Sequence, residues 1–475
     1  MNGSTLLQLF KTLDRADRRQ LRKIVRSPYF NAKDDVTRLF DYIDKNLETG
    51  GAAKMTKEKA YAFVYPKQAF DVDAFYYPMS FLTQIILKYL AINELENDTP
   101  QYHRLLNQAL RHRGADKIYE KTLADAKSHL DRQPHRNARY HFDNFQVHFE
   151  EFDARQGLHR DADFGLQGMT NDFHFYCISE ILRLAYALLS HQNISKKTYE
   201  QPLLDPVLTV AERYLHVPAV AIHYYAFKTL KDSTNRQLAE TRNDDVDTEG
   251  VYFQKLKTEI TENQKLFTAA ELRDLLYVAI NYSIRRQNQG ELAYVREALD
   301  LYQIGFDNRI LMENGVISPY TYNNAQLLAI KIKDFDWAEK FLNDYKPFLP
   351  EKERDNIYKY NLAIFHFRKN DYTTAMQLLQ EVNLKEVLFN LDARRLLARI
   401  YFETNEMNAL DSHIESSKIY LHRQKDVGYH KEAYSNFFKF MEKLVRKNWI
   451  SKEDFKAEIS QTSLLVEKDW LMNQI

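Results

Sequence analysis

Apolar side chains recur every three or four residues along most of the chain, the spacing that places them on one face of an α-helix. The pattern is clearest over residues 356–382, where it predicts two amphipathic helices joined by a tight polar turn at residues 369–371. A small side chain, Ala363 or Ala375, stands among the larger ones in each helix, as expected where two helices cross closely. This stretch therefore predicts a packed helical pair.

The order of residues in this pair resembles a tetratricopeptide (TPR) repeat. The small residues of the family match Ala363 and Ala375, and its Asp-Tyr start to the second helix matches Asp371-Tyr372. Three positions depart from the residues common in the family: Lys359 replaces tryptophan, His366 replaces tyrosine and Asn370 replaces glycine. Because asparagine tolerates the left-handed backbone nearly as well as glycine, the last departure costs little.

One helical pair cannot bury its apolar face alone, so stacked copies are expected. Similar patterns follow at residues 391–414 and precede at residues 320–350, and a degenerate one begins near residue 275. We therefore expect an all-α fold, an α-solenoid of TPR-like helix pairs with a helical N-terminal domain. The predicted divisions are a helical N-terminal domain with a basic first helix (1–97), irregular helical pairs (98–250), TPR-like repeats (251–427) and capping helices (428–475).

Polar residues in front of apolar runs predict where helices begin. Asp14 and Asn31 are expected to cap the first and second helices of the N-terminal domain, and Asn171 a long helix further on. Ser451 is expected to cap a single terminal helix that ends at Trp470. The whole segment of residues 428–475 would shield the apolar face of the last repeat.

The composition narrows the class of protein. Lys and Arg together equal Asp and Glu at 66 each, so no global charge favours nucleic acid or a membrane. The chain has only 12 glycines, and this low number disfavours phosphate-cradling loops and sheet-based nucleotide folds. The single Cys177 suits a reducing compartment, and the first residues lack the pattern of a signal peptide. These features predict a soluble cytoplasmic protein that does not bind a membrane.

Side chains that could carry chemistry do not form a recognisable catalytic motif. Eleven of the 15 histidines lie between His103 and His223, but His141 and His148 lack the spacing of helical zinc ligands. The loop of residues 159–163 offers hard ligands yet does not complete a coordination shell, and the acidic residues 244–247 lack an EF-hand spacing. Cys177 near His174 is interpreted as an inert thiol. We therefore expect no enzyme, no metal site and no cofactor.

The first basic helix carries the largest local excess of positive charge in the chain. It offers five arginines to an acidic partner or a nucleic acid: Arg15, Arg18, Arg19, Arg22 and Arg26. The same residues suit a solvated helix face beside an apolar stripe. The alternative function is thus a nucleic-acid-associated regulator with a ligand-sensing solenoid.

The resemblance implies a concave surface that binds extended peptides through inward-facing residues of the first helices. Carried over by alignment, the peptide-binding groove consists of Asn323, Tyr360, Asn361, Ile364, Phe367, Arg368, Arg395 and Arg399. Tyr360 and Ile364 replace polar partners that the family's carboxylate clamp requires, so capture of a terminal carboxylate in that manner is not expected. A mixed aromatic and arginine groove suits an amphipathic or acidic segment, although the aromatics could equally pack between repeats. We expect a non-enzymatic scaffold that binds a protein or peptide.

Overall fold

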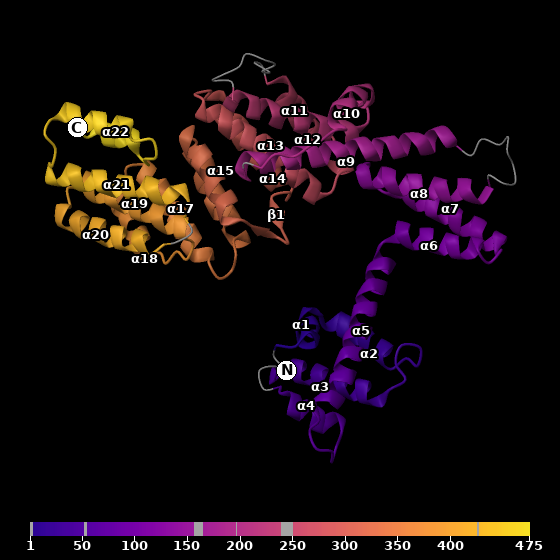
Figure 1. The fold of residues 1–475 in the computed structure, drawn as a ribbon. Coiled ribbons are helices and arrows are strands. Elements are labelled where there is room, and N and C mark those ends of the chain that lie inside the picture. Colours follow the sequence, from indigo (N-terminus) through magenta and orange to yellow (C-terminus); the bar gives the residue numbers. More distant parts are fainter. Residues whose placement is uncertain (1–2, 52–54, 156–164, 196, 239–249, 425–426) are drawn as a thin grey trace. The chain divides into compact units, whose positions relative to one another are not determined.

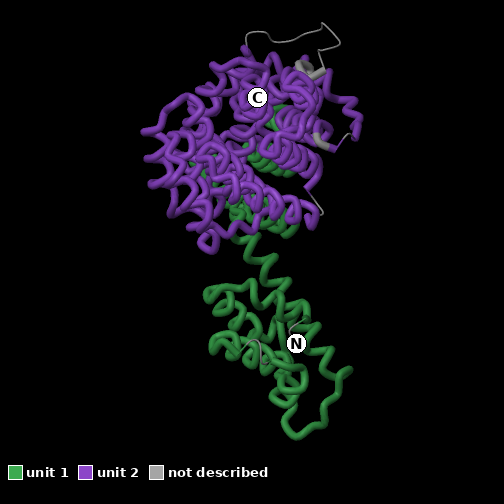
Figure 2. The backbone as a smooth tube through the Cα atoms, turned by 90° about the vertical axis from the view of Figure 1, so that its left-hand side faces the viewer, with its two compact units in different colours: residues 1–134, 139–176 green, residues 135–138, 177–475 purple. Residues whose placement is uncertain are grey.

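The computed structural model describes residues 3–51, 55–155, 165–195, 197–238, 250–424 and 427–475 (Figure 1). These residues form 23 α-helices, three short 3-10 turns and one small hairpin, which confirms the all-α prediction. No helix among them is long and apolar enough to cross a membrane. The chain divides into two compact units, coloured separately in Figure 2: residues 1–134 with 139–176, and residues 135–138 with 177–475.

The first unit begins with five helices around one apolar core. They are α1 (Thr5–Thr12), α2 (Arg15–Val25), α3 (Asp34–Glu48), α4 (Lys57–Val64) and α5 (Val72–Asn97). Leu7, Phe10, Leu21 and Phe40 are fully buried in this core. Asp14 caps α2 as predicted, because its carboxylate accepts from the backbone N–H of Asp17 at 2.8 Å.

Three further helices complete this unit, and a fourth continues into the second. They are α6 (Thr99–Arg111), α7 (Asp116–Arg132), α8 (Ala138–Arg155) and α9 (Leu166–Ser195). A smaller apolar cluster joins α7 to α8 through Tyr119, Leu123 and Val147. Asn171 lies inside α9 and does not cap it, so the predicted start of that helix is wrong.

The second unit continues with helices that pack against their sequence neighbours. They are α10 (Leu204–Ala211), α11 (Pro218–Leu238), α12 (Val251–Glu262), α13 (Ala269–Asn288) and α14 (Ala293–Asp307), with 3-10 turns at Glu212–Tyr214 and Gln264–Leu266. An antiparallel hairpin of β1 (Met312–Glu313) and β2 (Val316–Ile317) follows. Asn314 and Gly315 turn it with φ of 51° and 76°.

The remaining helices include the stretch with the clearest repeat pattern. They are α15 (Pro319–Lys331), α16 (Phe335–Tyr345), α17 (Arg354–Arg368), α18 (Tyr372–Glu381), α19 (Val387–Glu403), α20 (Met407–Arg423), α21 (Tyr429–Arg446), α22 (Lys452–Gln461) and α23 (Lys468–Asn473), with a 3-10 turn at Lys346–Phe348. The pairs α15–α16, α17–α18 and α19–α20 pack together, and α17 also contacts α15 and α19.

The same turn closes the first helix of each of these three pairs. Lys333, Asn370 and Asn405 adopt left-handed backbone with φ of 60–61°. The following residue donates its N–H back to the helix, as from Asp371 to the carbonyl of His366 at 2.9 Å. This is a Schellman motif, and its recurrence confirms the expectation that Asn370 takes the place of a glycine.

One further predicted helix start and one predicted helix end differ from the structure. Asn31 does not cap α3, whose N-cap is Lys33. Its side-chain amide instead donates to the carbonyls of Val25 and Lys33 and so holds the connection between two helices. Ser451 caps α22 as predicted, but that helix ends at Gln461, and α23 begins only at Lys468. The single terminal helix ending at Trp470 is therefore wrong.

His223 on α11 is fully buried, and neither of its ring nitrogens has a hydrogen-bond partner among the described residues. Burial lowers the pKa of His223 to about 4, against about 6.5 for an exposed histidine. An unfolded chain therefore binds a proton between these values that the folded chain does not. The contribution of neutral His223 to stability is complete above about pH 6.5 and is lost as the pH falls toward 4.

From about pH 7.5 to about pH 5, we expect the second unit to lose about 2 kcal/mol through His223. Urea unfolding followed by hydrogen exchange in α11 measures this loss. His223→Leu should remove most of this pH-dependent loss of stability, because all other titrating groups are kept. An equal pH dependence in the variant and the unchanged chain would contradict this assignment.

Candidate functional site on α17, α19 and α21

A carboxylate links three helices on the face where the peptide groove was predicted. Asp392 on α19 accepts hydrogen bonds from the hydroxyls of Tyr360 on α17 at 2.7 Å and Tyr434 on α21 at 2.8 Å. The Nε of Arg395, one turn along α19, donates to the same carboxylate at 2.8 Å. Although burial opposes ionisation, Arg395 and the two phenols hold the pKa of Asp392 below its usual range.

Glu467 extends this network from the connection between α22 and α23. Its carboxylate pairs with Arg395 and, at 2.7 Å, with Arg399. Each arginine side chain is only 11% exposed, and Glu467 is 16% exposed. Charge-assisted pairs of this kind are stronger where water is largely excluded. The connection between α22 and α23 is thus held to α19 by these ion pairs.

Two aromatic rings lie close to the guanidinium of Arg399. The guanidinium carbon is 4.9 Å from the ring centre of Phe367 and 4.7 Å from that of Trp470. Trp470 also packs edge-on against Phe402 and donates its indole N–H to Glu403 at 2.7 Å. Cation–π contacts of this kind fix the plane of the guanidinium.

The arginines of this cluster lie close enough together to repel one another. Three arginines, Arg368, Arg395 and Arg399, lie near three carboxylates, those of Asp392, Glu467 and Glu403. Burial and the neighbouring Arg395 and Arg368 lower the pKa of Arg399 to about 10. The Nε of Arg399 is buried without a hydrogen-bond partner among the described residues. The cluster can therefore accept a further anionic group.

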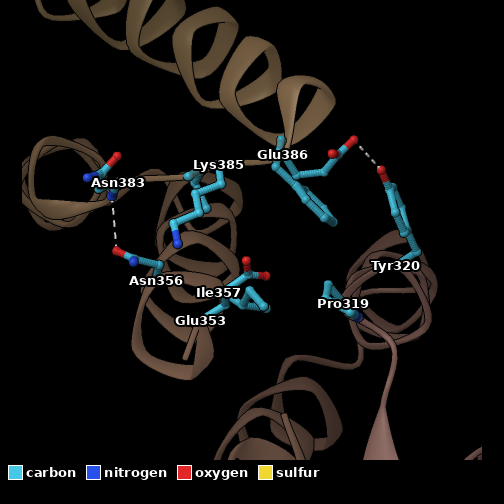
Figure 3. Close-up of a pocket in the computed structure, with 10 residues that line it drawn as sticks. Pro319, Tyr320, Glu353, Asn356, Ile357, Asn383, Lys385 and Glu386 are labelled. Atoms are coloured by element: carbon cyan, nitrogen blue, oxygen red, sulfur yellow. Dashed lines mark hydrogen bonds between the residues drawn. The ribbon is translucent and has the colours of Figure 1, made fainter. Parts of the chain in front are cut away.

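A pocket of about 410 Å³ lies beside the first turns of α15, α17 and α19 (Figure 3). Tyr320 donates from its hydroxyl to Glu386 at 2.7 Å, and the backbone N–H of Asn383 donates to Asn356 at 3.0 Å. Phe389 lines the pocket and also packs edge-on against Tyr360. That contact between two buried rings connects the pocket wall to the Asp392 network.

The predicted groove residues fall into two groups. Four are buried inside the helical stack: Tyr360, Asn361, Ile364 and Phe367. Asn361 receives on its backbone carbonyl a hydrogen bond from Gln326 at 2.6 Å, which joins α15 to α17. The other four are partly or fully accessible: Asn323, Arg368, Arg395 and Arg399. The structure brings the last three together, whereas Glu467 and Trp470 were not predicted from the sequence.

The basic helix α2 directs much of its charge toward α3. Arg18 and Arg22 pair with Asp44 at 2.9 and 2.5 Å, and Arg26 pairs with Asp41 at 2.8 Å. Arg15 and Arg19 are exposed. Three of the five arginines of the predicted acidic-partner surface thus have carboxylate partners within the unit.

The other residues considered for chemistry lie apart from this cluster. His141 bonds to Asp172 at 2.7 Å, and the described residues contain no group of three or more potential ligands that could hold a metal ion. Burial raises the pKa of the Cys177 thiol, which reduces its nucleophilic form. The loop of residues 159–163 and the acidic residues 244–247 lie outside the described residues.

No protein-family model, curated protein or solved structure matches the chain. The function is therefore argued from the geometry of the cluster itself.

Proposed function

We propose that the chain is a non-enzymatic, TPR-like repeat protein that binds a protein or peptide segment through the first-helix surface of α15, α17 and α19. The recurring Schellman turn after each first helix supports the repeat assignment, since it sets the same reversal between the helices of every pair. A regular stack aligns the first helices on one surface, which is how extended ligands are bound in such arrays.

The observation that carries this proposal is the group of mutually repelling arginines beside aromatic rings. Arginine and aromatic side chains are the residue types that contribute most to protein recognition. Arg368 is exposed at the end of α17, and partial burial together with Arg395 lowers the pKa of its guanidinium. An anionic segment on this surface would relieve the repulsion among the arginines. The favoured ligand is thus an acidic or amphipathic segment.

The nucleic-acid alternative has less support. It relies on the arginines of α2, and three of them already pair with two carboxylates of α3, Asp44 and Asp41. Electrostatic binding to phosphates depends on the number of cations that remain free to contact them. This alternative stays a prediction, tested by salt-dependent retention of DNA or RNA.

Arg368→Glu should lower recovery of a bound protein by at least about tenfold, because a reversed charge at the surface removes an attraction and adds a repulsion. The measurement is affinity purification of the tagged full chain with quantitative detection of co-purified proteins. Arg423→Glu is the matched control, since Arg423 is also exposed at the end of a helix, α20. Equal losses in both variants, or no loss in either, would contradict the proposal.

A further inference from the structure

The segment of residues 462–475 lies against the arginine cluster in the manner of a bound peptide. It leaves α22 at Gln461 and reverses at Glu467, which takes left-handed backbone with φ of 58°. A non-glycine residue in this conformation costs about 1–2 kcal/mol. The reversal places the Glu467 carboxylate on Arg395 and Arg399 and sets α23 beside α21.

Two side chains, three residues apart, provide the polar contacts of this segment with α19. Glu467 supplies the carboxylate, and Trp470 supplies a ring for Arg399 and an N–H for Glu403. Leu471 adds an apolar anchor and is fully buried. The recognised pattern is therefore an acidic residue followed three positions later by an aromatic residue and then an aliphatic one.

The segment is anchored less deeply than the helices beneath it. Leu471 is its only buried residue, whereas α19 buries eight side chains. The helix α23 has six residues, too few to be stable without its contacts. The carboxylate of Glu467 pairs with Arg395 and Arg399 but makes no ion pair with Arg368 among the described residues. A competing peptide with the same pattern could thus occupy the site at least as well.

We propose that residues 462–475 are an internal occupant of the binding surface, and that the partner presents an acidic-then-aromatic peptide segment that replaces them. This inference rests on the proposed function, since it names the ligand chemistry and the regulation of the same surface. An attached segment competes at the high effective concentration set by its short connection, so it raises the apparent dissociation constant of any partner.

The test uses a fluorescently labelled peptide with the sequence of residues 462–475 and measures its binding by fluorescence anisotropy. Two proteins are compared: the unchanged full chain and a full-chain variant carrying Glu467→Gln and Trp470→Ala. These substitutions weaken the contacts of the internal occupant and change no residue of α17 or α19. We expect the variant to bind the peptide at least about tenfold more tightly than the unchanged chain. A peptide carrying Glu467→Lys and Trp470→Ala should not bind either protein.

A second form of the protein provides an independent test if that variant misfolds. A protease site inserted after the exposed Gln461 allows the connection to be cut after folding. Cutting lowers the effective concentration of the segment, so on dilution it should leave and the labelled peptide should take its place. The helical circular dichroism of the remaining chain should be retained. Unchanged peptide binding in both the variant and the cut protein, or unfolding on release, would overturn the inference and assign the segment a purely structural role.

The two proposals fail separately. If Arg368→Glu abolishes partner recovery but the labelled peptide binds neither the variant nor the cut protein, the binding function stands and the internal occupant is wrong. If the peptide binds as expected but Arg368→Glu leaves partner recovery unchanged, the internal occupant stands and the proposed function is wrong.

Discussion

Replacing Asp44 by alanine is expected to destabilise the helical core of α1–α5 by about 3–5 kcal/mol, because it leaves two arginines without their shared carboxylate. Asp44 is only 3% exposed and pairs with Arg18 at 2.9 Å and Arg22 at 2.5 Å. Arg18 is itself 13% exposed, so its unpaired charge would remain largely out of water. Much of the loss arises from that stranded charge and exceeds the net contribution of the ion pair.

Native-state hydrogen exchange of the backbone amides in α2 and α3 measures this loss for the core alone. Asp41→Ala is the matched control, because its pair with Arg26 lies on the same two helices but is 39% and 48% exposed. That substitution should cost less than about 1 kcal/mol. Similar costs for the two substitutions would show that burial of the Asp44 pair does not determine the stability of this core.

Asp392→Ala should destabilise the packing of α17, α19 and α21 by about 3 kcal/mol, since it removes the acceptor for two tyrosines and one of the two carboxylate partners of Arg395. The Asp392 side chain keeps 26% of its surface exposed, so water can replace part of the lost contacts. Its depressed pKa gives the sign of the pH dependence. The contribution of this carboxylate is complete above the usual carboxyl pKa near 4 and is lost as the pH falls below it.

Tyr434→Phe is the control for the Asp392 substitution, because it removes a single hydroxyl from the network and keeps the ring. It should cost about 1 kcal/mol. Chemical unfolding of the full chain, with hydrogen exchange assigned to α17 and α21, separates the two effects. If Asp392→Ala costs no more than Tyr434→Phe, the carboxylate does not join the three helices as described.

Local sequence signals were sufficient for much of the helical architecture. Asp14 and Ser451 cap their helices because a short acceptor side chain before an amphipathic run satisfies free backbone N–H groups. Asn370 tolerates the left-handed turn that a glycine would otherwise occupy. These features depend on a few neighbouring residues, so they can be recognised in one sequence. The hairpin at Asn314-Gly315 carried an equally local signal and was missed.

The candidate site depends on contacts that local patterns do not encode. Nothing near Glu467 in the sequence indicates that it meets Arg395, which lies 72 positions away. Residues 462 and 463, Thr and Ser, are weak turn formers and gave no reason to divide the terminal helix. The alignment placed Arg395 and Arg399 near each other because they are one turn apart on α19. It could not show that buried Tyr360 and Asn361 join helices.

The most direct test of the binding surface is photo-crosslinking from single positions of the full chain. Lys385 is exposed and lines the pocket beside α17 and α19, whereas Gln377 is exposed on α18 and does not line it. A photoreactive amino acid at position 385 should crosslink a co-purifying protein, and the same residue at position 377 should not. Crosslinks from position 377 with none from position 385 would contradict the assignment of the first-helix surface as the binding site.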